Sequence, residues 1–223
     1  MAIAIGDIHG CLAPLEKLVS RLPPGRELVF LGDYIDRGPD SAGVVAFLLT
    51  LAQTRPCRFL MGNHEDMLLK ALRSPDHIGQ WIINGGTATL KSYGSNVEDW
   101  RLQPSRGALF GEHGEFFKGL AMFYQDPHAI YVHAGINPAL EDMPQQKANT
   151  LLWVREEFFS KPERWRGKPV VFGHTPTRFM GLSGREIYKN PPYFGIDTGC
   201  VYGGFLTAFD PATGEIWQAN NMG

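Results

Sequence analysis

The chain repeatedly alternates a short apolar run with a small residue and a polar one. The runs "AIAI", "LVFL", "RFLM", "AIYV" and "VVF" lead into "GD" (6–7), "GD" (32–33), "GN" (62–63), "HAG" (133–135) and "GH" (173–174). Runs of about four residues that are rich in valine, isoleucine and phenylalanine and closed by glycine are typical of buried β-strands. The pattern therefore predicts strands that deliver polar side chains at their C-terminal ends.

Helical patterns separate the first three predicted strands. In the segment 11–22 the apolar residues fall on one face of a helix, namely Leu12, Leu15, Leu18, Val19 and Leu22. Helical segments at 41–52 and 65–72 follow the second and third strands. Alternation of strand and helix predicts parallel pairing, in which the C-terminal strand ends meet at one edge of the sheet. We expect this edge to gather Asp7, His9, Asp33, Asn63, His64, His133 and His174.

The rest of the chain is less regular. The segment 76–120 has a helical pattern and predicts a side or cap layer within a single domain that spans residues 1–223. The C-terminal part alternates short runs with turns, and "DPATGE" (210–215) is typical of a hairpin turn. We expect a second, mainly antiparallel sheet there. Two facing sheets with helices outside would give an α/β sandwich.

Composition narrows the class of protein. Of 223 residues, 43% are apolar and 20% charged, which predicts a packed globular core. The net charge of −2 excludes the strong basic bias of a dedicated nucleic-acid binder. Three scattered cysteines are too few for a disulfide framework, and the N-terminal segment resembles neither a signal peptide nor a membrane span. We therefore expect a cytoplasmic protein without membrane partners.

The strand-end residues are suited to metal chemistry. Aspartate, histidine and asparagine are ligands for divalent ions that prefer oxygen and nitrogen. Two ions about 3.5–4 Å apart would share a carboxylate, lower the pKa of a bound water towards about 7 and clamp a phosphoryl group. Asp7 and His9 alternate along a segment that we expect to be extended, so their side chains should point the same way.

Each residue also has an ordinary alternative interpretation. A single Gly–Asp pair is most often a turn, and a lone histidine is more often a structural hydrogen-bonding group than a ligand. Four histidines and two aspartates at five strand ends are harder to explain in that way. The sequence contains neither a cysteine followed six residues later by arginine, nor a phosphate-binding P-loop, nor a G-x-S-x-G motif.

Five motifs together resemble the phosphoprotein phosphatase family of metallophosphoesterases. They are "GDIHG" (6–10), "GDYIDRG" (32–38), "GNHE" (62–65), "HAG" (133–135) and "GHT" (173–175), in that order. "WIINGG" (81–86), "LLWVRE" (151–156) and "IDTG" (196–199) are similar to the bacterial and bacteriophage-lambda-type enzymes. The resemblance implies a calcineurin-like, four-layer αββα sandwich of two mixed sheets flanked by helices.

The resemblance also implies metal ligands. Asp7 and His9 would hold a first ion, and Asp33 would bridge both ions. The second ion would be completed by Asn63, His133 and His174. The family implies two divalent ions, Mn²⁺ or an Fe/Zn pair.

Further roles follow from the same motifs. His64 would be the general acid, and Asp36 would hydrogen-bond to it and keep it protonated. Arg37 and Asn63 would hold the phosphate. Tyr202 either packs or reaches the edge of the site.

Arg155 can be argued from the residues themselves. If the segment 151–159 is one helix, Arg155 falls in the middle of its apolar stripe, which consists of Leu151, Leu152, Phe158 and Phe159. The helix would then aim a guanidinium at an internal anion site. The alternative is a packed stem whose charged head reaches water. The family resemblance makes Arg155 the second phosphate clamp.

These residues predict a hydrolase that releases phosphate from phosphoserine or phosphothreonine in proteins, with phosphotyrosine as a further substrate. Direct in-line attack by a hydroxide held by the two ions is the expected mechanism. The alternative is a symmetrical diadenosine tetraphosphate hydrolase or another small-molecule phosphatase. Symmetrical hydrolases tend to lack the inner aspartate that corresponds to Asp36, which favours the phosphatase. A non-catalytic binding scaffold is disfavoured because the expected site residues are all present.

Overall fold

The computed structural model describes residues 2–103 and 105–220. Within these residues the strands form two five-stranded sheets. The first sheet has the order β10-β9-β1-β2-β3, and the second has the order β4-β5-β6-β8-β7. The strands of the first sheet are β1 (Ala2–Ile5), β2 (Glu27–Phe30), β3 (Cys57–Phe59), β9 (Leu206–Phe209) and β10 (Ile216–Ala219). Those of the second are β4 (Phe123–Gln125), β5 (Ile130–Val132), β6 (Val170–Phe172), β7 (Tyr188–Asn190) and β8 (Tyr193–Gly195).

The parallel pairing expected for the first three strands is confirmed. β1 pairs with β2 with Ile3 opposite Leu28, and β2 pairs with β3 with Leu28 opposite Cys57. In the second sheet β5, β6 and β8 are parallel, while β4 and β7 are antiparallel edge strands. The C-terminal ends of β1, β2, β3, β5 and β6 can therefore meet at one edge of the sandwich.

The expectation of a separate, mainly antiparallel C-terminal sheet was wrong. The hairpin of β9 and β10, closed by the turn at 210–215, pairs with β1 and belongs to the first sheet. β7 and β8 join the second sheet instead, where β8 runs parallel to β6. The physical reason is that β2 pairs with only one edge of β1, and β9 satisfies the backbone groups of the other edge.

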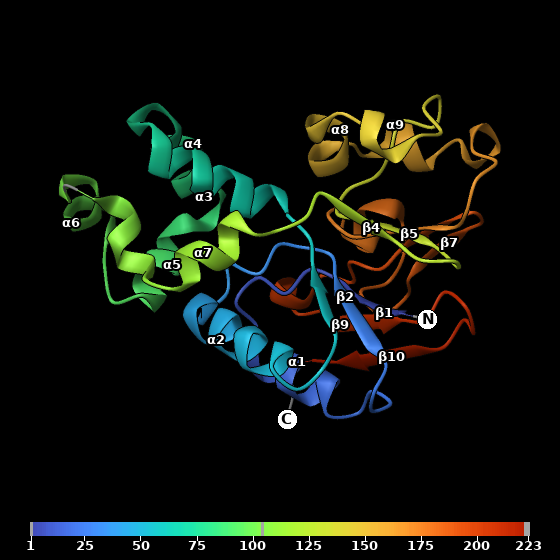
Figure 1. Cartoon of the computed structure of the whole chain (residues 1–223), viewed down its shortest axis with the longest axis horizontal. Helices are drawn as coiled ribbons and strands as arrows, with labels where there is room; N and C mark the ends of the chain where they lie inside the picture. The colour runs from blue at the N-terminus through green and yellow to red at the C-terminus, as the bar shows by residue number, and fades with distance from the viewer. Residues whose placement is uncertain (1, 104, 221–223) are drawn as a thin grey trace.

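Helices cover the outer face of each sheet, which confirms the four-layer sandwich (Figure 1). α1 (Leu12–Val19) and α2 (Ser41–Ala52) pack on the first sheet, where Ile3 and Ile5 face them. The alternate residues Ala2 and Ala4 face the second sheet and pack with Tyr131 and Val171. α8 (Ala148–Trp153) and α9 (Glu156–Phe159) cover the far side of the second sheet.

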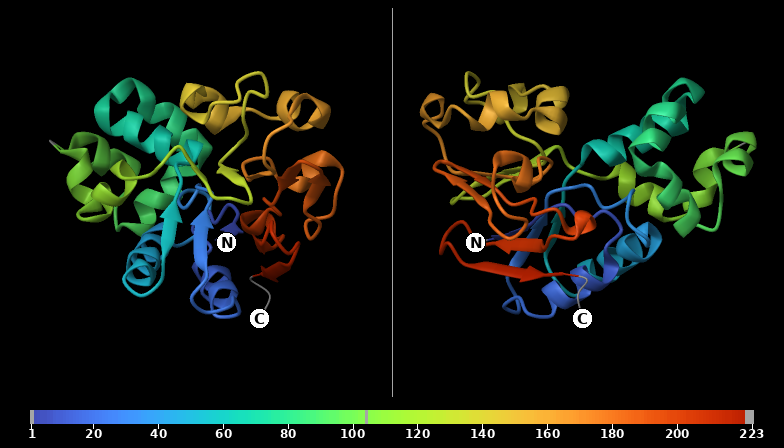
Figure 2. Two further views of the ribbon diagram at one scale, coloured as in Figure 1. Left: turned by 45° about the vertical axis from the view of Figure 1, so that its right-hand side comes forward. Right: turned by 180° about the vertical axis from the view of Figure 1, so that it is seen from behind.

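The remaining helices lie to one side of the two sheets (Figure 2). They are α3 (Asn63–Arg73), α4 (Ile78–Trp81), α5 (Thr87–Ser92), α6 (Val97–Leu102) and α7 (His113–Lys118), with a π-helical turn, η2 (Ile82–Gly86), between α4 and α5. Short 3₁₀ turns are η1 (Pro75–His77), η3 (Arg106–Phe110), η4 (Met143–Gln145), η5 (Pro162–Arg164), η6 (Thr177–Met180) and η7 (Cys200–Tyr202). The grouping of 76–120 as a cap within one domain stays a prediction. Across the described ranges, none of the helices combines the length and apolarity that crossing a membrane requires.

Candidate metal centre and active site

The loops that follow five strands converge on one buried polar cluster. Asp7 and His9 follow β1, Asp33 follows β2, and Asn63 opens α3 after β3. His133 and His174 follow β5 and β6 in the second sheet. All of these side chains are buried. The sandwich therefore brings together the residues that the strand ends were expected to deliver.

Asp33 lies at the centre of the cluster. Its Oδ2 is 3.4 Å from Nε2 of His9, and its Oδ1 is 3.5 Å from Nε2 of His133. Asn63 Oδ1 lies 2.9 Å from His133 Nε2 and 2.9 Å from His174 Nδ1. The carboxylate of Asp33 therefore touches both sides of the cluster, as a bridging ligand must.

Two groups of side chains can each hold a divalent ion, and they share Asp33. One group contains His9 and His64, and the other contains His133 and His174, with ligand atoms within 4.8 Å of one another. His174 turns Nδ1 towards the cluster, 2.9 Å from Asn63 Oδ1, so this nitrogen can serve as a ligand. This donor set, oxygen and imidazole nitrogen around a shared carboxylate, fits a pair of divalent ions.

Asp7 lies beside these groups rather than within them. Its carboxylate accepts the main-chain N–H of His174 at 3.0 and 3.1 Å. The expectation that Asp7 and His9 lie on one extended segment was wrong, because β1 ends at Ile5 and His9 has a φ of 47°. A hydrogen bond from His9 Nδ1 to the carbonyl of Ile35, at 2.8 Å, orients the ring instead.

The site loops adopt an unusual backbone. Among the described residues, the non-glycine residues with left-handed φ all belong to the candidate site: His9, Asp33, Asp36, Arg37 and His174. Gly38 completes this arrangement, because a Cβ there would collide with the carbonyl oxygen of His9. Such conformations cluster at functional sites.

His64 and Asp36 form a buried pair that the sequence had predicted. His64 Nδ1 lies 2.6 Å from Asp36 Oδ2, and His64 Nε2 has no hydrogen-bond partner in the described part of the chain. Two residues of the lateral helices hold the carboxylate. Trp81 Nε1 donates to both oxygens of Asp36 at 3.0–3.1 Å, and Thr89 Oγ1 donates at 2.6 Å. Trp81 and Thr89 had been assigned no role, although "WIINGG" contains Trp81.

Burial sets the protonation of this pair. It raises the pKa of Asp36 to about 8, although hydrogen bonds from Thr89 and Trp81 oppose the shift. Burial, followed by the charge of Arg37, holds the pKa of His64 well below its usual range. The protein's own groups therefore favour an uncharged pair, whereas the sequence had suggested that Asp36 keeps His64 protonated.

The buried carboxylates are costly without a cation. Burial raises the pKa of Asp33 to about 7 and that of Asp197 to about 6, and it raises the pKa of Asp7 well above its usual range. Burial also lowers the pKa of His133 to about 3, which keeps the imidazole neutral. Neutral imidazoles beside crowded carboxylates are what divalent ions require of their ligands.

Two acidic residues of the site had been assigned no role. Glu65, the last residue of "GNHE", accepts main-chain N–H groups of Asp33, Tyr34 and Gly62 at 2.8–3.0 Å and fixes the central loops. Asp197 of "IDTG" is buried, and its charge raises the pKa of Asp7. The motifs themselves contained both signals, but spacing alone did not indicate what the side chains contact.

Arg37 and Arg155 reach the same cleft from segments far apart in the sequence. Arg37 Nη1 lies 2.7 Å from His9 Nε2, and Arg155 Nη1 donates to the His174 carbonyl at 3.2 Å and to Thr175 Oγ1 at 3.1 Å. Both arginines line a cleft of about 450 Å³. Tyr202 lines it as well, so it lies at the edge of the site.

The single helix expected over 151–159 was wrong. α8 ends at Trp153, and α9 begins at Glu156 after Arg155 leaves the helical region with φ −131° and ψ −122°. Arg155 is an exposed residue and is not set in a core-facing stripe. The break is what turns the guanidinium towards His174.

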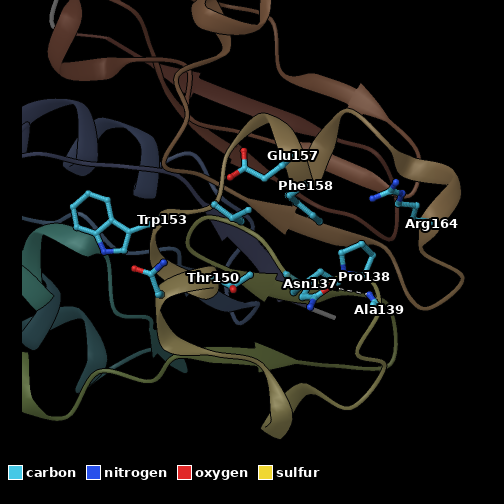
Figure 3. A pocket seen from close by; sticks show the side chains of 11 residues that line it. Asn137, Pro138, Ala139, Thr150, Trp153, Glu157, Phe158 and Arg164 are labelled. Carbon is cyan, nitrogen blue, oxygen red and sulfur yellow. Dashed lines mark hydrogen bonds between the residues drawn. The ribbon is translucent and has the colours of Figure 1, made fainter.

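A larger cavity of about 650 Å³ is lined in part by the segment 151–159 (Figure 3). Trp153 lies at one end of it and Arg164 at the other. The Trp153 ring also packs edge-on against His174, with centroids 6.0 Å apart. The described lining of this larger cavity includes neither Arg37 nor any candidate metal ligand. A scissile phosphate therefore belongs in the smaller cleft, with Arg37 and Arg155.

Comparison with known proteins decides the family. A family model described as calcineurin-like phosphoesterase matches residues 2–198. The chain belongs to the calcineurin-like phosphoesterase family. This phosphoesterase is therefore an enzyme that hydrolyses phosphoesters, and the family uses a pair of divalent ions for which the Asp33 cluster provides candidate ligands.

Relatives of this phosphoesterase include a protein phosphatase and bis(5′-nucleosyl)-tetraphosphatases. It is 34% identical over 219 residues to serine/threonine-protein phosphatase 1 of Salmonella typhimurium, covering 91% of this chain and 88% of that protein. This match confirms the resemblance to phosphoprotein phosphatases. It is also 28% identical over 235 residues to an asymmetrical bis(5′-nucleosyl)-tetraphosphatase of a Geobacillus species, covering 92% and 88%. The crystal structure of a candidate diadenosine tetraphosphatase superposes with a TM-score of 0.71 at 26% identity, over 100% of this chain and 94% of the other.

Proposed function

We propose that this phosphoesterase hydrolyses phosphomonoesters, and that its substrates are phosphoserine and phosphothreonine in proteins. The His64–Asp36 pair carries the proposal, because the free Nε2 of His64 can protonate a leaving oxygen. A serine or threonine alkoxide is a poor leaving group and gains most from a positioned acid. A nucleotide leaves as a phosphate anion, which needs less help.

The other side chains of the site have complementary roles in this proposal. Arg37 and Arg155 would bind the non-bridging oxygens of the phosphate, to which a guanidinium is well matched. Asn63 would contact both the phosphate and an ion.

The ligands of two divalent ions would be Asp7, His9, Asp33, Asn63, His133 and His174. We propose Mn²⁺ as the native metal, with an Fe/Zn pair as the alternative. When bound, the ions would supply a nucleophilic water at neutral pH and neutralise the charge of the phosphate.

Hydrolysis of bis(5′-nucleosyl) tetraphosphates is a second candidate function. The tetraphosphatase relatives and the TM-score of 0.71 favour it. The expectation that symmetrical hydrolases lack a counterpart of Asp36 disfavours that kind, but it is no argument against the asymmetrical kind, to which the Geobacillus relative belongs. The two candidates require the same ions and the same arginine clamp.

A direct comparison of substrates tests the proposal. The protein, loaded with Mn²⁺, is assayed for kcat/KM on a phosphoserine peptide and on diadenosine tetraphosphate. We expect the higher value on the peptide. A higher value on the dinucleotide would reverse the order of the two candidates. Products then identify the cleavage, since two ADP indicate symmetrical attack and ATP with AMP indicates asymmetrical attack.

A further inference from the structure

Three side chains of η6 and η7 form a rim at the mouth of the cleft. We call Arg178, Phe179 and Tyr202 the rim cluster. The guanidinium carbon of Arg178 lies 4.2 Å from the ring centroid of Tyr202 and 4.9 Å from that of Phe179. Arg37 approaches the Tyr202 ring at 5.7 Å. The rim cluster is thus joined directly to the phosphate clamp.

The exposure of the Phe179 and Tyr202 rings is not explained by packing within the protein. Phe179 is 69% exposed and Tyr202 is 42% exposed, while both line the cleft. An exposed cation–π contact is worth only about 0.5–1 kcal/mol, which orients a guanidinium but adds little stability. Large aromatic side chains left open beside a functional cleft indicate a ligand.

A third arginine lies next to the cleft, which gives one more cation than a single phosphate needs. Arg37 and Arg155 provide two guanidinium groups, and together with two ions they match the oxygens of one phosphate. Arg178 adds a third guanidinium beside the cleft, over the rings of Phe179 and Tyr202 that line it. Burial raises the pKa of Asp197, and the charges of Arg37, Arg155 and Arg178 all oppose that rise, so each of the three acts on the same buried carboxyl.

An acidic side chain further restricts the chemical class of the ligand. Glu156 borders the same cleft, facing away from the apolar core. A bare polyphosphate chain offers nothing for a carboxylate to accept. A nucleoside provides hydroxyl and amino hydrogen-bond donors together with a planar base that stacks on an aromatic ring.

We propose that the rim cluster determines specificity for nucleoside polyphosphates: Arg178 pairs with the phosphate next to the scissile one, and the base stacks on Phe179. Tyr202 is a positioning residue that holds Arg178. This inference rests on the second candidate function. The reaction stays a hydrolysis, in which the water oxygen bonds to phosphorus, the bridging P–O bond breaks and the nucleotide leaves as an anion.

Two variants and two matched controls test the rim cluster. In the Mn²⁺-loaded protein, Arg178→Gln should lower kcat/KM on diadenosine tetraphosphate about 10-fold or more relative to p-nitrophenyl phosphate, mainly through KM. Phe179→Ala should lower the same ratio about 5- to 100-fold, the usual effect of losing one stacked base. Arg185→Gln is the control for Arg178, because Arg185 also lies over a ring, at 4.9 Å from Phe205, but lines a different cavity. Leu102→Ala, at a side chain 84% exposed, is the control for Phe179.

Inhibition of p-nitrophenyl phosphate hydrolysis separates this inference from the candidate function. ADP should inhibit more strongly than AMP, since only ADP has a second phosphate, and Arg178→Gln should abolish the difference. If the protein does not hydrolyse the dinucleotide but this inhibition pattern holds, the second candidate function is wrong, and the role of the rim cluster in recognising nucleoside polyphosphates is supported. Equal inhibition by ADP and AMP in the parent protein, or equal losses on all substrates in Arg178→Gln, would overturn the inference.

Discussion

Thr89 is the residue through which the lateral helices act on the proton donor. Its Oγ1 donates to Asp36 Oδ1 at 2.6 Å, accepts the Asp36 N–H at 2.9 Å and lies 3.1 Å from Ser41 Oγ. The side chain is fully buried. Thr89→Val preserves the shape of the side chain and removes these hydrogen bonds, so it isolates the support given to Asp36.

The magnitude follows from the lost hydrogen bond. Asp36 is largely uncharged at neutral pH because burial raises its pKa to about 8, and a hydrogen bond between uncharged groups contributes about 0.5–1.5 kcal/mol. Since about 1.4 kcal/mol corresponds to a factor of ten, kcat should fall about 2- to 10-fold where proton donation limits the rate. The hydrogen bond from Thr89 lowers the pKa of Asp36, so its loss moves that pKa further above about 8 and weakens the carboxylate as a partner of His64.

The assay compares leaving groups. We expect the full loss on phenyl phosphate, whose phenolate leaves poorly, and a smaller loss on p-nitrophenyl phosphate. Thr50→Val is the matched control, because Thr50 is an exposed residue of α2 whose hydroxyl donates to the Ala46 carbonyl of its own helix. An equal loss on both substrates, with thermal unfolding and metal content unchanged, would refute the reasoning.

Three further predictions concern the acid, the ions and stability. His64→Ala should lower kcat most on poor leaving groups while elemental analysis shows full metal content; lost metal would make His64 a ligand. Asp33→Asn should lose bound metal, measured by the same analysis, because both ligand groups share this carboxylate. Asp126→Asn should lower the free energy of unfolding by about 1–3 kcal/mol at pH 7. Burial raises the pKa of Asp126, but N–H and hydroxyl donors outweigh it and leave the pKa below its usual value. The stabilisation is therefore present above about pH 4 and lost at lower pH, so urea unfolding should show the two proteins converging there.

The sequence predicted the parts of the site that depend on strand ends. Asp33, Asn63, His133 and His174 meet because alternating strands and helices impose parallel pairing, and parallel strands deliver their C-terminal residues to one edge. The pair of His64 and Asp36 was also predicted, from the motifs rather than from periodicity. These inferences needed only local patterns and one topological rule.

Local patterns could not predict features that depend on contacts between residues far apart in the sequence. β9 is buried on both faces, so its apolar pattern does not say which sheet it joins, and only the edge of β1 that β2 does not pair with decides it. Likewise, the apolar stripe of 151–159 continues through the break at Arg155, because Leu152 and Phe158 pack inward on either side of it. The contact of Arg155 with the His174 carbonyl, which accompanies that break, spans 19 residues.

The backbone of "GDYIDRGPD" shows why turn chemistry and metal chemistry need not be alternatives. Asp33, Asp36 and Arg37 have φ values of 54°, 72° and 69°, a conformation that costs an L-residue about 1–3 kcal/mol. Glycine would relieve that cost at each position, but it would remove the shared carboxylate, the partner of His64 and the phosphate clamp. The left-handed turn aims successive side chains in different directions, towards His9, His64 and the cleft. The segment is therefore a turn whose strain is retained because the strained residues are the ones that do the chemistry.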